Sequence, residues 1–146
     1  MAFPRRHSDQ HVLTSIVTVL RASTGVTGIA SRGVHVEVPQ GTSPPYVKIA
    51  GSIASRRADT QGRFGKQILI DVDSITQGDS QIAGLQLRDA ACRALDFVHL
   101  TVSLSTGQTL LGLAYESDTY YTEIVNAIKT HHHLASFRAW TEQSST

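Results

Sequence analysis

Three consecutive histidines are the residues of this chain best suited to chemistry. His131, His132 and His133 precede an apolar segment, and in a strand the first and third would share one face, about 6–7 Å apart. Imidazoles at that spacing can help to bind zinc, which needs three or four ligands. No nearby Asp, Glu or Cys completes the set in the sequence. We therefore expect exposed histidines at the entry of a strand and no metal site.

Two carboxylates form the next candidate cluster. Asp71 and Asp73 are two positions apart in an apolar, strand-like segment, so both should point away from the core together. Paired carboxylates can perform acid–base chemistry or hold a divalent cation. No third ligand or nucleophile lies beside them, so we expect a solvated or inter-subunit face.

The remaining reactive residue types do not form a known catalytic pattern. Cys92 is the only cysteine and lies among alanines, which is typical of a small buried apolar residue. The glycines of residues 24–28 match neither a phosphate-binding loop nor a dinucleotide fingerprint, and no nucleophile-elbow sequence occurs. The sequence thus predicts no catalytic residue, no cofactor and no enzyme activity.

A polar, arginine-rich loop is predicted at residues 54–65. It could be a solvated hairpin tip, a docking arm whose guanidinium groups meet carboxylates of a neighbour, or a nucleic-acid contact. One aromatic residue, Phe64, is a weak match to a base-stacking platform. The candidate inter-subunit residues of this segment are Arg56, Arg57, Asp59, Arg63 and Lys66.

The elements that would position these residues are two helices and a long strand pair. Apolar residues at helical spacing, Leu13, Ile16, Val17 and Leu20 among them, predict a helix over residues 10–23. A second helix is predicted over 79–96. Alternating apolar residues predict strands over 46–55 and 66–74. We expect an α/β (α+β) fold, with one mixed or antiparallel sheet of four to five strands and both helices on one face.

The other segments are predicted from shorter patterns. Further strands are expected at 34–38, 100–104, 109–115 and 134–141, and one or two helical turns are possible at 122–128. Residues 1–8 are expected to form a mobile arm and residues 143–146 a loose tail.

Length and composition indicate a single domain. The chain has 146 residues, 40% of them hydrophobic and 17% charged, which suits one folded core with a surface of low charge density. The net charge of +1 favours neither nucleic acid nor an acidic membrane. No apolar run is long enough to cross a bilayer, and no secretory signal precedes the first helix.

The order of these pieces resembles a known family. Residues 10–142 are similar to the tail terminator (tail completion) proteins of long-tailed bacteriophages and gene transfer agents. The matching parts are the first helix, the segment 38–47 with its Pro44-Pro45 step, the central strand 67–72, the helix 82–95 and the closing strands 110–115 and 134–141.

The resemblance implies a structural virion protein in the tail–neck region, assembled in the host cytoplasm. It implies a hexameric ring that caps the tail tube and joins it to the head–neck stopper or connector protein, while DNA passes through the lumen without specific binding. The arginine-rich loop would then dock on the neighbouring subunit or the tube. The alternatives are another neck component, such as a connector or stopper, and a small ligand-binding or enzymatic domain.

Overall fold

The computed structural model describes residues 9–60, 63–96 and 108–143 and has an α+β fold. Its elements in chain order are α1 (Asp9–Ala22), α2 (Thr24–Thr27), β1 (Val34–His35), β2 (Tyr46–Thr60), β3 (Arg63–Gln77), α3 (Ile82–Asp96), β4 (Gln108–Val125) and β5 (Ile128–Gln143). The predicted fold class is therefore confirmed, and both main helices begin and end within a few residues of their expected positions.

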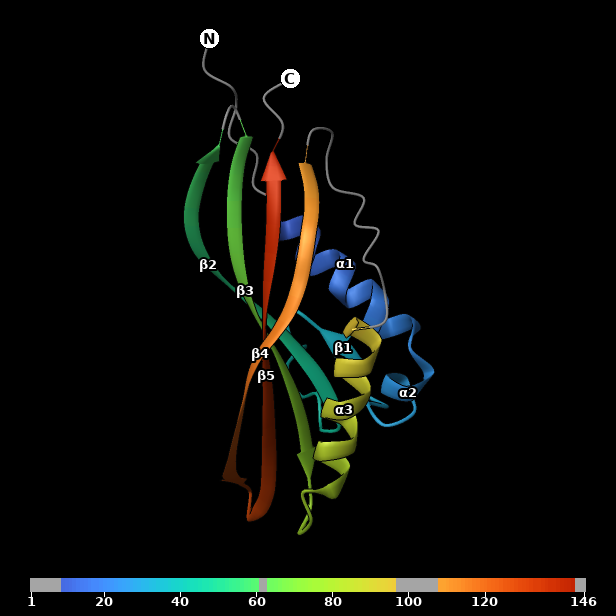
Figure 1. Ribbon diagram of the computed structural model, residues 1–146. Coiled ribbons are helices and arrows are strands. Elements are labelled where there is room, and N and C mark those ends of the chain that lie inside the picture. Colours follow the sequence, from blue (N-terminus) through green and yellow to red (C-terminus); the bar gives the residue numbers. More distant parts are fainter. Residues whose placement is uncertain (1–8, 61–62, 97–107, 144–146) are drawn as a thin grey trace.

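One mixed sheet forms the body of the molecule. Its strand order is β1-β2-β3-β5-β4; β1 runs parallel to β2, and every other neighbouring pair is antiparallel. The strands β2 to β5 are long and twist strongly along their length, whereas β1 is short (Figure 1). All three helices lie on the same side of this sheet, so its other face is left without a helical cover (Figure 1).

The hydrophobic core lies between the helices and the covered face of the sheet. In β3 and β5 the inward residues alternate as expected for strands with one buried face, and the helices add a stripe at helical spacing. Arg21 closes the end of α1, because its Nε and Nη2 donate to the Val34 carbonyl oxygen at 3.1 and 2.7 Å. The buried core residues include Val12, Ile16, Leu20, Ile49, Ile68, Ile70, Val72, Leu87, Ala91, Leu95, Ala135, Phe137 and Ala139.

The long strand pair extends farther than its sequence pattern indicated. β2 continues to Thr60 and β3 starts at Arg63, so most of the expected loop at 54–65 is strand. Pairing resumes at Ala58 with Gly65 after an irregular stretch. Because paired strands satisfy backbone hydrogen bonds that a loop would leave to water, polar residues can be drawn into a ladder that neighbouring strands already support.

The predicted helical turns at 122–128 are wrong. β4 runs to Val125, and Asn126 and Ala127 form a two-residue turn into β5 with φ values of 52° and 63°. Both residues are left-handed, which is the geometry that joins two twisted strands tightly. Long-range pairing of β5 with β3 on its other side accounts for the difference, because local periodicity carries no information about it.

Smaller differences between the predicted and the observed structure concern the first and last residues of the elements. β1 covers Val34–His35 only, shorter than the strand expected at 34–38. Gln143, placed in the loose tail, is the last residue of β5 and pairs with Phe64 and Gln108. The arm at 1–8, the strand at 100–104 and the tail residues 144–146 lie outside the described residues.

Candidate interaction site on the open sheet face and hairpin

The three histidines are buried, so the expectation of exposed strand-entry residues is wrong. They lie in β5, with exposed fractions of 3% for His131, 7% for His132 and 1% for His133. β5 is an inner strand between β3 and β4, and this position buries both of its faces more than an edge strand would. Alternation places His131 and His133 on the helix-covered face and His132 on the open face.

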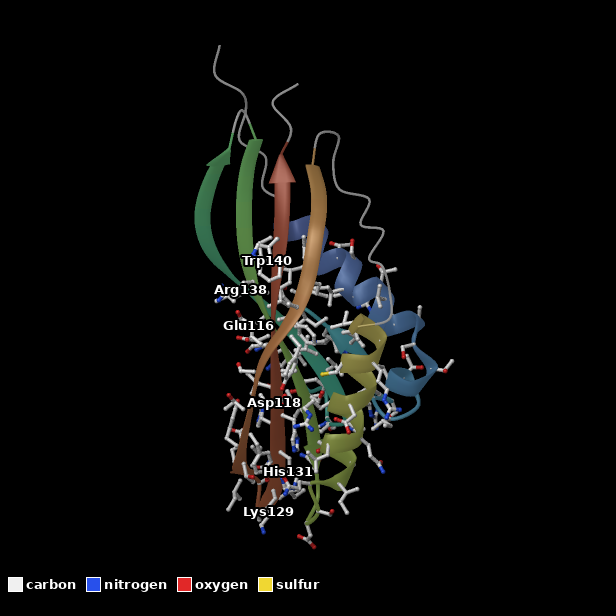
Figure 2. All side chains as sticks on the ribbon, viewed as in Figure 1. Glu116, Asp118, Lys129, His131, Arg138 and Trp140 are labelled. Carbon is white, nitrogen blue, oxygen red and sulfur yellow. The ribbon has the colours of Figure 1, made fainter. Side chains whose placement is uncertain are left out.

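His131 ties the hairpin to the segment before α3. Its Nδ1 lies 2.9 Å from the Tyr120 hydroxyl and its Nε2 lies 2.7 Å from the carbonyl oxygen of Gly78. Figure 2 shows His131 and Lys129 together near the turn between β4 and β5. Both ring nitrogens are thus engaged in structural hydrogen bonds, which satisfy the polar atoms of this buried side chain.

His133 is buried as an apolar ring would be. It packs against α3 at Gly84, where a Cβ would lie 2.5 Å from its Nδ1. Neither ring nitrogen has a hydrogen-bond partner among the described residues. Burial lowers the pKa of His133, and the nearby Arg88 guanidinium lowers it further. The ring is therefore held neutral.

His132 links three strands on the open face. Its Nδ1 lies 2.9 Å from Asp73 Oδ2 on β3, and its Nε2 lies 2.7 Å from Glu123 Oε1 on β4. The Tyr121 ring stacks on it at 4.4 Å with an interplanar angle of 5°. Two carboxylates and an aromatic ring therefore surround this one imidazole.

The two aspartates have different environments. A solvated face is wrong for Asp73, and the alternative of an inter-subunit face stays a prediction. Asp73 is 8% exposed, and burial raises its pKa although the hydrogen bond to His132 opposes that effect. Asp71 is half-buried and accepts a hydrogen bond from Ser136 Oγ at 2.7 Å. Both do point to the same face, and both serve cross-strand contacts.

Two further ion pairs anchor β4. Glu116, the extra residue of a bulge in β4, lies 2.7 Å from Arg138 Nε on β5. Asp118 lies 3.4 Å from an Arg88 guanidinium nitrogen on α3. A hydrogen bond to Asp118 is the main cause that raises the pKa of Tyr115 to about 12. Figure 2 shows Glu116 and Arg138 farther up the strands than Lys129.

The end of the β4–β5 hairpin is an exposed apolar surface, which we call the hairpin tip. Its large hydrophobic residues are between 42% and 72% exposed, and Ile124 is the most exposed of them. β4 is also an edge strand with three acidic residues and no lysine or arginine. Long, apolar edge strands are ready to pair with another chain. The hairpin tip comprises Tyr120, Tyr121, Ile124, Val125 and Ile128.

The predicted docking residues lie at the opposite end of the sheet. Ala54 pairs with Gln67 and Ala58 with Gly65, so residues 55–57 of β2 lie opposite Lys66 alone. This irregular stretch brings the backbones of Arg56, Arg57 and Lys66 together. The other two residues, Asp59 and Arg63, follow in the regular pairing beyond it. Their role in contacts between subunits stays a prediction.

An open hollow beside the hairpin has a polar lining. It is bordered by Asp79, Gln81, Tyr120, Thr122, Lys129 and His131. Within the described residues, no three His, Cys, Asp or Glu side chains gather as metal ligands would. Among the residues that the structure describes, no helix is long and apolar enough to span a membrane.

Comparison with known protein families decides the affiliation. Residues 14–142 match the family described as tail completion protein gp17. The chain belongs to this tail completion family. The match covers nearly all of the chain and confirms the resemblance that the order of its elements had indicated, and with it a structural role in a phage-like tail.

A solved structure shares the fold of this tail completion protein. A chain from the structure titled "Virion of native gene transfer agent (GTA) particle" matches with a TM-score of 0.78 and 21% identity, over 94% of this chain and 99% of that chain. That chain is a component of an assembled gene transfer agent particle. A search of curated proteins finds no match.

The hairpin tip and the His132 cluster are the site features that sequence reasoning missed. The available signal was Asn126-Ala127 between two β-branched segments, because an Asn-containing pair between such segments is a turn signal. The contacts of His132 had no local signal. Its partners Asp73 and Glu123 are 59 and 9 residues away in the sequence.

Proposed function

We propose that this chain forms a hexameric ring that caps and terminates the tail tube and makes the interface between the tail and the head–neck proteins. The observation that carries the proposal is membership of the tail completion family over residues 14–142. The matching fold of a chain from a gene transfer agent virion supports it. The protein acts by binding, without catalysis or a cofactor.

The sheet offers the surfaces that a closed ring needs. A ring repeats one heterologous interface, so each subunit must present two different, complementary surfaces. β4 is one edge of the sheet, and β2 beyond its short pairing with β1 is the other. The hairpin tip adds an apolar surface near one end of β4. These edges are where we place the contacts between subunits.

The ring would bring the virion partners of the protein together. One side of the ring binds the tail tube protein, and the other binds the stopper or connector of the neck. DNA passes through the lumen without specific binding, which agrees with a net charge of only +1. In this proposal the ring is assembled in the host cytoplasm and lies in the tail–neck region of the virion.

Electron microscopy of the purified protein, alone and mixed with tail tubes, tests the proposal. We expect six-fold rings or decoration of one tube end. Rings of a different symmetry that bind no tube would favour a connector instead. A persistent monomer that leaves both tube ends bare would contradict the proposal.

The basic residues of the irregular stretch in β2 provide a finer test. The double reversal Arg56→Glu and Arg57→Glu should weaken ring formation or tube docking, because guanidinium groups pair well with carboxylates of a neighbour. A matched control reverses Arg32 and Arg93, which are exposed on the helix side and change the net charge equally. Unchanged ring size by light scattering and normal capping in the first variant would exclude these arginines from the interface.

A further inference from the structure

The hydrogen bonds of His132 require a definite number of protons. Ionised carboxylates can only accept hydrogen bonds, whereas a neutral imidazole donates from one nitrogen and accepts at the other. His132 has a carboxylate oxygen within 2.9 Å of each nitrogen, from Asp73 on one side and Glu123 on the other. Both bonds form only if the ring is an imidazolium, or if one carboxyl keeps its proton. In either case the three groups hold two protons together.

The charges around His132 balance when the three groups hold two protons. The Tyr121 ring lies parallel to the imidazole at 4.4 Å, an arrangement in which an aromatic face attracts a cation. With an imidazolium, the charges of Asp73, Glu123 and the exposed Lys48 sum to zero; with a neutral ring, one negative charge remains in excess. Lys48 stands directly opposite Asp73 in the β2–β3 register.

The other titratable groups near His132 do not supply the charge that its proton provides. Tyr46 on β2 and Tyr121 on β4 have pKa values raised by burial and by the charges of Asp73 and Glu123, so both phenols stay neutral. His131 and His133, its neighbours on β5, point to the opposite face of the sheet. The helices also lie on that opposite face (Figure 1).

We propose that the shared proton of Asp73, His132 and Glu123 fastens β4 to the inner strands, and that its loss at alkaline pH releases Glu123. Glu123 is the carboxylate that separates from His132, because its side chain is 52% exposed and water can replace its hydrogen bond. The Asp73 side chain is only 12% exposed. A neutral imidazole then keeps one N–H for Asp73. We call Asp73, His132 and Glu123 the clasp, because their hydrogen bonds hold the hairpin to β3 only while the proton is bound.

The clasp has a consequence for the surface next to it. Glu123 directly precedes Ile124 and Val125 of the hairpin tip, so its release removes a side-chain contact that supports the backbone pairing of the last residues of β4 with β5. The clasp thereby controls how rigidly the backbone of the apolar hairpin tip is held. This inference depends on the geometry of three side chains and stands whether or not the protein forms a ring.

Amide hydrogen exchange of the whole chain tests the clasp. Protection of residues 121–125 and 128–132, corrected for the intrinsic exchange rate, is measured between about pH 6 and pH 9, where a histidine cluster can titrate. We expect protection to fall by about tenfold as the proton leaves, as for loss of one charge-assisted hydrogen bond. Protection that stays constant in the wild type would overturn the proposal.

Matched variants separate the clasp from general effects of pH. In Glu123→Gln the amide can donate to or accept from a neutral ring, so the pH dependence should disappear. Glu116→Gln removes the other ion-paired glutamate of β4, which contacts Arg138, and should keep the wild-type pH dependence. Equal pH dependence in Glu123→Gln and the wild type would overturn the proposal.

Nitrogen NMR of the wild-type ring needs no variant. At about pH 6, where a histidine can hold its second proton, we expect hydrogens on both ring nitrogens of His132, or on one of them together with a protonated carboxyl. A ring with one bare nitrogen beside two ionised carboxylates at that pH would overturn the proposal.

Discussion

At the scale of single residues, several polar side chains are buried where α3 meets the sheet. His133 lies between the sheet and α3 at the point where Gly84 lets the helix approach. Ser74 and Thr76, on the same face of β3, are also buried without a hydrogen-bond partner among the described residues. Buried polar atoms without partners are costly, so this part of the helix–sheet contact should be sensitive to single changes.

Gly84→Ala should lower the free energy of unfolding by about 1–3 kcal/mol, as for other overpacked sites. The new Cβ would meet His133 Nδ1 at 2.5 Å and Thr76 Oγ1 at 2.9 Å. Urea denaturation measures the change. The control is Gly25→Ala, whose Cβ would lie 3.7 Å from Ala90 Cβ and should alter stability by less than about 1 kcal/mol. Equal effects of the two variants would contradict the close contact.

His133 should make the protein less stable as the pH falls. Its pKa is lowered in the folded state by burial, so the unfolded chain, with a histidine pKa of about 6.5, takes up the proton first. The contribution is present above about pH 6.5 and is lost as the pH falls toward the folded-state pKa. Urea denaturation at about pH 7.5 and pH 5.5, on either side of that value, should show a smaller drop for His133→Leu than for the wild type.

His35→Leu is the matched control for the pH measurement. His35 is a half-buried histidine whose Nε2 bonds to the Arg32 carbonyl oxygen, away from α3. Comparison of the two variants separates loss of the buried His133 ring from loss of a histidine elsewhere in the fold. A drop that is unchanged in His133→Leu would show that this histidine is not held neutral.

At the scale of elements, the β4–β5 hairpin differs most from the rest of the fold in strand length and exposure. Its strands have 18 and 16 residues, yet only two residues turn the chain between them. Beyond Tyr115, every described residue of β4 is exposed. β4 is an edge strand and pairs with a neighbour on one side alone. Its position therefore depends on the turn into β5 and on the contacts of Glu116, Asp118 and Glu123.

Ala127→Gly should stabilise the hairpin. Ala127 has a φ of 63°, which an L-residue with a Cβ adopts at a penalty of about 1 kcal/mol, whereas glycine adopts it freely. The free energy of unfolding should rise by up to about 1 kcal/mol for the same reason. Ala114→Gly, within the regular part of β4, should lower it by about 0.5–1 kcal/mol. Destabilisation by both variants would argue against a left-handed residue in the turn.

At the scale of the whole molecule, the arrangement is asymmetric in a way that suits assembly. Helices cover one face of the sheet (Figure 1). The other face carries the His132 cluster, and the apolar hairpin tip lies at one end. Chain segments 54–60 and 63–66, with the predicted docking residues, lie at the other end of the same strands. Each subunit can thus contact different partners at its two ends.

Ile124→Asp should weaken assembly without weakening the fold. Ile124 is 72% exposed, so the isolated chain loses little burial, whereas a carboxylate would be desolvated in any interface that covers the tip. Analytical ultracentrifugation gives the oligomer size, and thermal unfolding gives the stability. Val36→Asp, another exposed apolar residue far from the hairpin, is the control. Wild-type assembly of Ile124→Asp would exclude the hairpin tip from the interface.

The sequence by itself determined the local elements and the family. The helical stripe from Val12 to Leu20 and the alternation of Ile68, Ile70 and Val72 depend on residues that are close together in the chain, and each decides which face is buried. Tertiary structure decided the hairpin, the strand ends and the burial of the histidines. His132 is placed by a strand 59 positions away and a turn 5 residues back. Long-range pairing supplies the hydrogen bonds and the exclusion of water that turn a polar segment into an inner strand, and a local pattern does not contain that information.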